Sequence, residues 1–181
     1  MRWQLLLLLA LSGLAFAPAT PSLPRGTPIF TLGWARTQVD SALAARSVEA
    51  LTAGIDFITT PGETPEVEYI EYSFVPVAHG SPLLWKVTYG YRVPYGQEVF
   101  EGAKGTLIGD LGQPDEEHHA DVKGGDLVDK LTWADASTVV QLGARWPEHQ
   151  DEGADRMLVT WVDRRLQKMA SVKNKKAANK K

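Results

Sequence analysis

The chain has 181 residues, with 22 acidic and 19 basic side chains, a formal net charge of −3 and no cysteine. The absence of cysteine excludes disulfide bonds, thiol catalysis and a lipid-modified N-terminal cysteine. Five of the lysines lie in residues 172–181; removing these five and Arg2 from the 19 basic residues leaves 13 against 22 acidic ones, a charge of about −9. This acidic body argues against nucleic acid as the main partner.

Residues 1–19 are typical of a cleaved signal peptide. Arg2 precedes a long apolar stretch, and Ala15 and Ala17 are the small residues that a signal peptidase requires. The apolar stretch is shorter than the roughly 20 residues that span a membrane. We therefore predict a secreted or periplasmic protein with no transmembrane segment after signal removal.

Prolines and a glycine make residues 20–29 a predicted linker. Residues 30–95 then predict one helix followed by three strands. In the helix, over 32–46, Val39 and Leu43 recur at the spacing that places them on one face. Alternating or β-branched segments between turn sequences predict the strands, at 54–60, 67–77 and 82–93.

Residues 96–171 repeat this order. A helix is predicted over 96–112, with apolar residues on one side and a stop at Gly112 and Pro114. Strands are predicted at 126–135, 137–146 and 156–169. The lysine-rich end, 172–181, has almost nothing to bury, so we expect a disordered tail that makes at most a weak contact with a polyanion.

The fold class that follows is α+β. It consists of two tandem helix–β–β–β units, 30–95 and 96–171, with an antiparallel sheet or sheets and the helices packed on one face. The match between the units is one of pattern rather than of sequence. Whether the two units share one sheet stays open.

Two short segments resemble a known helix signature. "GWARTQVDSAL" places Gly33, Val39 and Leu43 at G-x5-V-x3-L, and "LIGDLGQP" supplies L-x3-L-G-x-P. Together they resemble the signature of the small outer-membrane-assembly lipoproteins and their structural relatives. Those relatives include the secreted β-lactamase inhibitor proteins, which are a tandem of two such units.

The resemblance implies a binding module rather than an enzyme, and as partner another envelope or secreted protein. This chain departs from the family in having neither a lipobox cysteine nor cysteines for disulfides. The residues agree that catalysis is not expected, because no G-x-S-x-G turn, phosphate-binding loop or dinucleotide motif occurs. No cofactor is predicted. Hydrolysis of cell-wall or glycan material by paired carboxylates is the weakest alternative.

The segment "PDEEHHAD", 114–121, concentrates acids and histidines. We interpret it first as a solvated loop. The alternative function is a metal-binding envelope protein, in which side chains at alternate positions supply ligands and a second loop joins them. The candidate ligands are Asp115, Glu117, His118, His119, Asp121 and His149.

Aromatic residues are the better indication of a binding surface. Tyrosine and tryptophan are favoured at protein interfaces, and "YGYRVPYG" lies where the two predicted units meet. We predict that the partner surface is an open, concave sheet face carrying Tyr91, Tyr95 and Trp146.

Overall fold

The computed structural model describes residues 22–27, 29–91, 97–122, 126–146 and 156–178. The predicted signal peptide, Tyr95 and His149 lie outside these residues. Nothing in the fold therefore bears on them.

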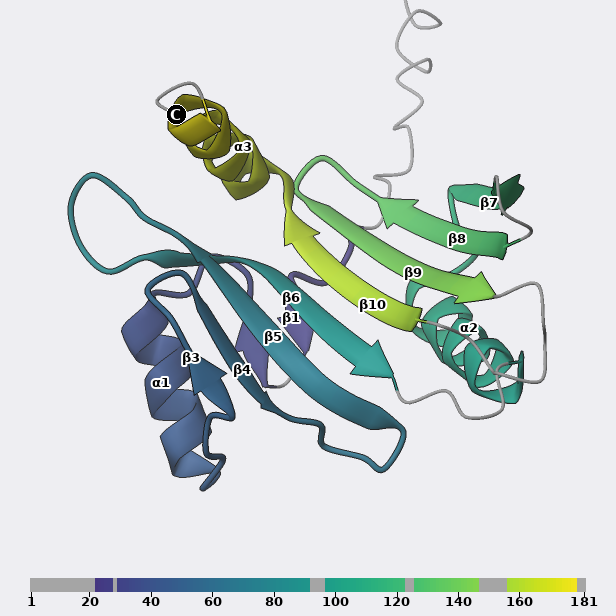
Figure 1. The fold of residues 1–181 in the computed structure, drawn as a ribbon, viewed down its shortest axis with the longest axis horizontal. Coiled ribbons are helices and arrows are strands. Elements are labelled where there is room, and N and C mark those ends of the chain that lie inside the picture. The colour runs from purple at the N-terminus through teal and green to yellow at the C-terminus, as the bar shows by residue number, and fades with distance from the viewer. Residues whose placement is uncertain (1–21, 28, 92–96, 123–125, 147–155, 179–181) are drawn as a thin grey trace, which may run out of the picture.

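The described chain forms three helices and an eight-stranded antiparallel sheet, with a two-stranded ribbon beside it (Figure 1). The helices are α1 (Arg36–Ala45), α2 (Gln97–Leu111) and α3 (Arg164–Ala178). The ribbon pairs β1 (Gly26–Thr27) with β2 (Phe30–Thr31). The sheet order is β3-β4-β5-β6-β10-β9-β8-β7. Its strands are β3 (Thr52–Ala53), β4 (Phe57–Pro61), β5 (Val67–Val75), β6 (Leu83–Tyr91), β7 (Glu116–Val122), β8 (Asp126–Ala134), β9 (Thr138–Trp146) and β10 (Arg156–Asp163).

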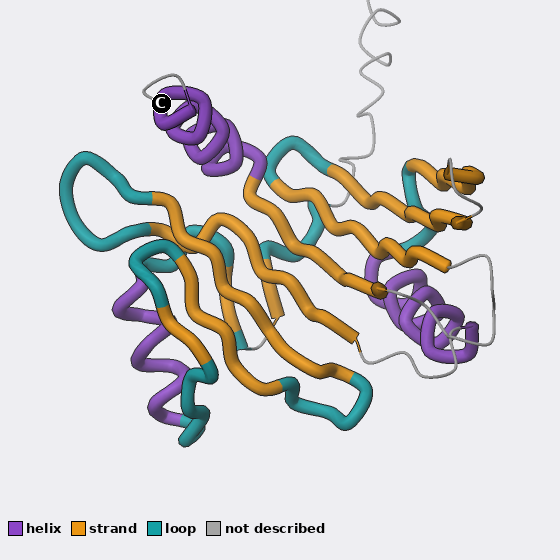
Figure 2. The backbone as a smooth tube through the Cα atoms, viewed as in Figure 1, coloured by secondary structure: helices purple, strands orange, loops and turns teal. Residues whose placement is uncertain are grey.

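The α+β class and the antiparallel sheet are confirmed. The number of strands is corrected, because α1 and α2 are each followed by four strands rather than three. The sequence pattern missed the short strands β1 and β2 and the two edge strands of the large sheet, β3 and β7. β6 pairs with β10, so all eight strands share one continuous sheet, as the tube in Figure 2 shows.

One face of the sheet carries the core. Tyr72, Val87, Trp161, Val140 and Trp133 lie directly opposite one another on successive strands, and each is at least nine-tenths buried. Successive side chains on a strand point to opposite faces, so this register gives every strand a buried and an open side. We call the side away from this core the open face.

Helices α1 and α2 cover the core face. Val39 and Leu43 of α1 are buried in the same cluster as Tyr72, which confirms the predicted apolar face of this helix. Phe100 of α2 packs edge-on against Trp146 of β9, with ring centroids 5.7 Å apart. Each helix thus covers the sheet half that follows it in the chain.

The predicted stop of α2 is confirmed. Gly112 has a φ of 83°, a left-handed conformation that glycine adopts without a steric cost, and its amide donates to the carbonyl of Ile108 at 2.9 Å. The Gly112 carbonyl in turn accepts a hydrogen bond of 2.8 Å from the indole of Trp133. The helix end is therefore fixed to the core of the sheet.

The predicted strand over 156–169 is wrong in its second half. β10 ends at Asp163, and α3 begins at Arg164 and continues to Ala178, into the segment expected to be disordered. The cause is the Asp163 side chain, whose Oδ1 accepts the amide of Leu166 at 2.8 Å and so caps the helix. Aspartate is a strong N-cap residue, and this local bond overrides the alternating pattern that runs through it.

Helix α3 corrects the expectation that all helices pack on one face. It contacts β5, β6 and β10, and its Ala170 lines a hollow with Glu71, Ser73 and Trp85 of the open face. A β-bulge between Ser73 and Phe74 lets Trp85 take part in this contact, where the sequence pattern placed it on the covered face. α3 therefore shields part of the first half of the open face.

Part of the predicted linker belongs to the fold. Arg25 forms an ion pair with the buried Asp163 and also donates to the carbonyl of Leu32 at 3.1 Å. The amide of Leu23 donates to Asp135 at 2.7 Å. Within the described residues, no helix is long and apolar enough to cross a membrane.

The cap of α3 gives a first test. Replacing Asp163, which is 3 % exposed, by alanine removes the acceptor for Leu166 and the partner of Arg25. We expect Asp163→Ala to lower the free energy of unfolding by about 2 kcal/mol, as the sum of a lost cap and a lost charged hydrogen bond. Urea unfolding followed by circular dichroism measures it. Arg25→Gln keeps the cap and should cost less than about 1 kcal/mol; equal costs would contradict a capping role.

Asp135 gives a pH test. Burial opposes its ionisation, but hydrogen bonds from the amides of Thr138, Ser137 and Leu23 outweigh burial and hold its pKa below the usual range. Because the folded pKa is the lower one, the ionised group stabilises the fold above the unfolded pKa of about 4 and ceases to do so as the pH falls. Asp135→Asn should cost about 1 kcal/mol at neutral pH and less at about pH 3. Thermal unfolding across this range checks it; a pH-independent cost would be the contrary result.

Candidate binding face of the sheet

The segment "PDEEHHAD" forms most of an edge strand rather than a loop. β7 pairs with β8 along its whole length, and Asp115 just before it accepts the amide of Ala134 at 2.6 Å. Exposed edge strands invite pairing with other chains, and charged side chains discourage it. The acids and histidines of this segment therefore have a structural explanation that requires no metal.

The two histidines point to opposite faces of the sheet. His119 lies opposite Asp129 and forms a hydrogen bond with it on the core face, while Asp129 Oδ2 accepts the indole N–H of Trp146 at 2.7 Å. His118 lies opposite Lys130 on the open face. The structure thus separates the adjacent histidines and commits Asp129 to its neighbours.

The candidate metal ligands do not converge among the residues that the structure describes. There, no group of three or more histidine or acidic side chains could hold an ion. The side chain of Asp121 and all of His149 fall outside the description. Asp115 is used in the turn before β7, and Glu117 lies on the core-face side of the strand opposite Leu131.

The predicted aromatic surface is not on the open face. Tyr91 lies opposite Met157, a fully buried core residue, and burial raises the pKa of its phenol. Trp146 packs against α2 and donates to Asp129. Both are half-buried against the core, so the placement of these two residues on an open sheet surface is corrected.

The open face instead carries a polar row that crosses every strand. Its members lie directly opposite one another from one sheet edge to the other. In sheet order they are Thr52, Thr59, Glu71, Thr88, Thr160, Gln141, Thr132 and Glu116. Near its centre, Thr88 is 6 % exposed, and its hydroxyl has no hydrogen-bond partner within the described part of the chain.

A second row, the glycine row, runs beside it. It consists of Tyr69, Gly90, Leu158, Gly143, Lys130 and His118 on six successive strands. At Gly90 the ring of Tyr69 occupies the space of the missing side chain, because a Cβ there would lie 2.2 Å from Tyr69 Cε1. At Gly143 the space is empty, since the nearest atom to a Cβ would be the Asp129 carbonyl oxygen at 3.9 Å.

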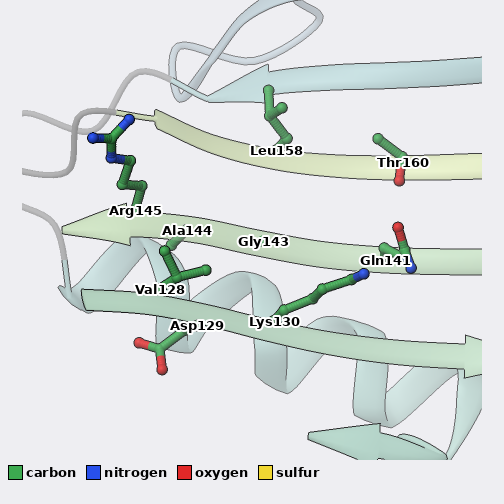
Figure 3. Close-up of a pocket in the computed structure, with 9 residues that line it drawn as sticks. All are labelled: Val128, Asp129, Lys130, Gln141, Gly143, Ala144, Arg145, Leu158 and Thr160. Carbon is green, nitrogen blue, oxygen red and sulfur yellow. The ribbon is translucent and has the colours of Figure 1, made fainter. Parts of the chain in front are cut away.

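The empty space at Gly143 opens into a hollow of ≈ 360 Å³ on the second half of the open face (Figure 3). The side chains of Leu158 and Val128 supply apolar surface, while Gln141 and Thr160 from the polar row supply donors. We call this feature the Gly143 hollow. Figure 3 shows the Asp129 carboxylate directed away from it.

Two cationic residues line the Gly143 hollow. Lys130 and Arg145 line it, and both are exposed. Among the side chains that the structure describes on the open face of β7 to β10, Glu116 at the far edge is the one carboxylate. On a chain with 22 acidic residues against 19 basic ones, this is a locally cationic surface.

Sequence reasoning missed these residues. Their signal is present in "TVVQLGARW", where a glycine interrupts an alternating strand; such a glycine marks a bulge or a close approach by another group. What it does not reveal is the neighbour in space. The pairing of Gly143 with Lys130 and Leu158 appears only in the folded sheet.

Comparison with protein-family models, with curated proteins and with solved structures finds no match in any of the three.

The two glycines of the glycine row form a matched pair for a test. Gly90→Ala forces the Cβ into the Tyr69 ring and should cost about 1–3 kcal/mol through overpacking. Gly143→Ala meets only ordinary contacts and should be neutral or stabilise by up to about 1 kcal/mol, because alanine loses less entropy in a strand. Urea unfolding midpoints compare them. Equal changes in the unfolding midpoint would contradict a filled space at Gly90 and an empty space at Gly143.

Proposed function

We propose that this protein is a non-catalytic binding module, secreted or periplasmic, that holds another envelope or secreted protein on the open face of its sheet. The observation that carries the proposal is the second half of that face. It combines exposed cations, hydrogen-bond donors and an apolar hollow with no helix of the described chain across it. Protein interfaces combine apolar contact with polar groups at the rim in this way.

The arrangement of the chain supports a tandem origin. From α1 to β6 and from α2 to β10 the order is helix then four strands, and the two halves meet at their last strands. We infer that these are two units of one kind, as in the secreted inhibitor proteins that the helix signature resembles. In that signature Gly33 has a φ of 92°, and Val39 and Leu43 are buried, so its residues have structural roles here.

Binding rather than chemistry is supported by how the polar residues are used. Asp163 caps a helix, Asp135 orders a turn and Asp129 joins a histidine to an indole. Each of these carboxylates already has structural partners. The Gly143 hollow holds cations and neutral donors, a combination suited to binding a partner's acidic groups.

Site-specific crosslinking tests the surface. A benzophenone amino acid replaces His118, which is exposed beside Lys130 on the open face, or Asp110 on α2, which is exposed on the other side of the sheet. After irradiation in the producing cell, we expect a protein adduct from position 118 and none above background from position 110. Mass spectrometry of the adduct identifies the partner.

The two positions share the reagent and the expression level, so they control for non-specific capture. Adducts from position 110 alone would move the binding surface to the helical side of the molecule. Purified protein that carries no adduct at either position, from any cell fraction, would contradict a binding module that uses this sheet.

A further inference from the structure

We propose that the Gly143 hollow receives an acidic, extended segment of the partner, with an apolar side chain over Gly143 and a neighbouring carboxylate held by Lys130. This rests on the proposed function and names the chemistry of the partner. Four features of the described residues lead to it: shape, charge, hydrogen-bond donors and coverage.

The shape argument comes from the first half of the same sheet. At Gly90 a side chain from the adjacent strand, Tyr69, lies in the space that the glycine leaves. Gly143 leaves a comparable space, but its neighbours Leu158 and Lys130 do not fill it. The hollow therefore has room for a side chain from outside, and Leu158 and Val128 offer it apolar surface.

The charge argument concerns Lys130. It is exposed, and it makes no ion pair within the part of the chain that the structure describes. On the first half of the open face the corresponding cation, Lys86, is paired with Glu71 at 3.6 Å and lies 5.5 Å from the Trp85 ring centroid. Lys130 thus remains available to a carboxylate from a partner.

Hydrogen-bond donors along one side of the hollow fix the orientation of an extended ligand. Gln141 and Thr160 are half-buried members of the polar row that line one side of the hollow. Beyond them, the buried hydroxyl of Thr88 is without a partner among the described residues. An amide and a hydroxyl can donate hydrogen bonds to the backbone carbonyls of a bound segment, while Lys130 contacts one of its carboxylates.

The position of α3 explains why a partner meets the second half of the open face rather than the first. α3 packs across β5 and β6 and buries Leu166, so the first half already has an intramolecular occupant. Near the Gly143 hollow the described chain places no helix on the open face. A partner segment therefore meets the half in which the cations are exposed.

The test uses two synthetic peptides and the full chain, labelled with ¹⁵N and purified as the cell processes it. One is acetyl-Glu-Val-Glu-Val-Glu-amide, and the other has glutamine at each glutamate. Amide chemical shifts are followed at about 25 mM and about 250 mM salt. We expect the acidic peptide to shift Gly143, Gln141 and Thr160, at least about tenfold more weakly at the higher salt, because screening reduces attraction between exposed charges. The neutral peptide should bind at least tenfold more weakly than the acidic one.

Three variants locate the contact. Gly143→Val fills the hollow, and valine suits a strand; Lys130→Gln removes one charge. Each should weaken binding of the acidic peptide about tenfold, equivalent to about 1.4 kcal/mol. Gly102→Ala, at an exposed position of α2 with nothing within 4 Å of the added Cβ, is the matched control and should leave binding unchanged.

Equal shifts with both peptides, or shifts confined to other residues, would overturn the proposal. Tighter binding of a single-stranded oligonucleotide at the same amides would overturn it in favour of a phosphate ligand. If the crosslinked partner is still captured by Gly143→Val and Lys130→Gln with undiminished yield, the binding module stands and the assignment of the hollow is wrong.

Discussion

The pairing of β6 with β10 is the constraint on which the rest of the molecule depends. It joins the last strands of the two halves through consecutive pairs from Met157↔Tyr91 to Val162↔Lys86. Because side chains alternate along a strand, a slip of one residue would carry Val87 and Trp161 from the core to the open face. The burial of these residues therefore fixes the register, and the register fixes which side chains the open face displays.

The same register explains how one sheet carries both a core and a polar open face. It places large apolar residues such as Trp133 and Trp161 together beneath α1 and α2, and it places threonines and glycines together on the other side. An antiparallel sheet often has one packed and one solvated face. Here α3 packs on part of the solvated face, so that face has one half covered by α3 and one half without a helix among the described residues.

Local patterns predicted the parts of the fold that depend on local sequence. The apolar spacing of Val39 and Leu43 and the stop at Gly112 were sufficient for α1 and α2. The pattern failed at β7, where an edge strand made of charged residues resembles a loop, and at Asp163, where a helix cap lies inside an alternating sequence. At β7 the pairing with β8 decides the structure. At Asp163 the local cap on the amide of Leu166 decides it.

The sequence by itself determined the α+β class, the two strongly periodic helices and the central strands, because helical and strand periodicities are properties of neighbouring residues. It could not determine which side chains the open face displays. The sequence shows that Tyr91 and Trp146 are aromatic, but only the sheet register decides that their side chains face the core. Gly143, Lys130 and Leu158 are far apart in the chain or on different strands, and only strand pairing brings them into one hollow.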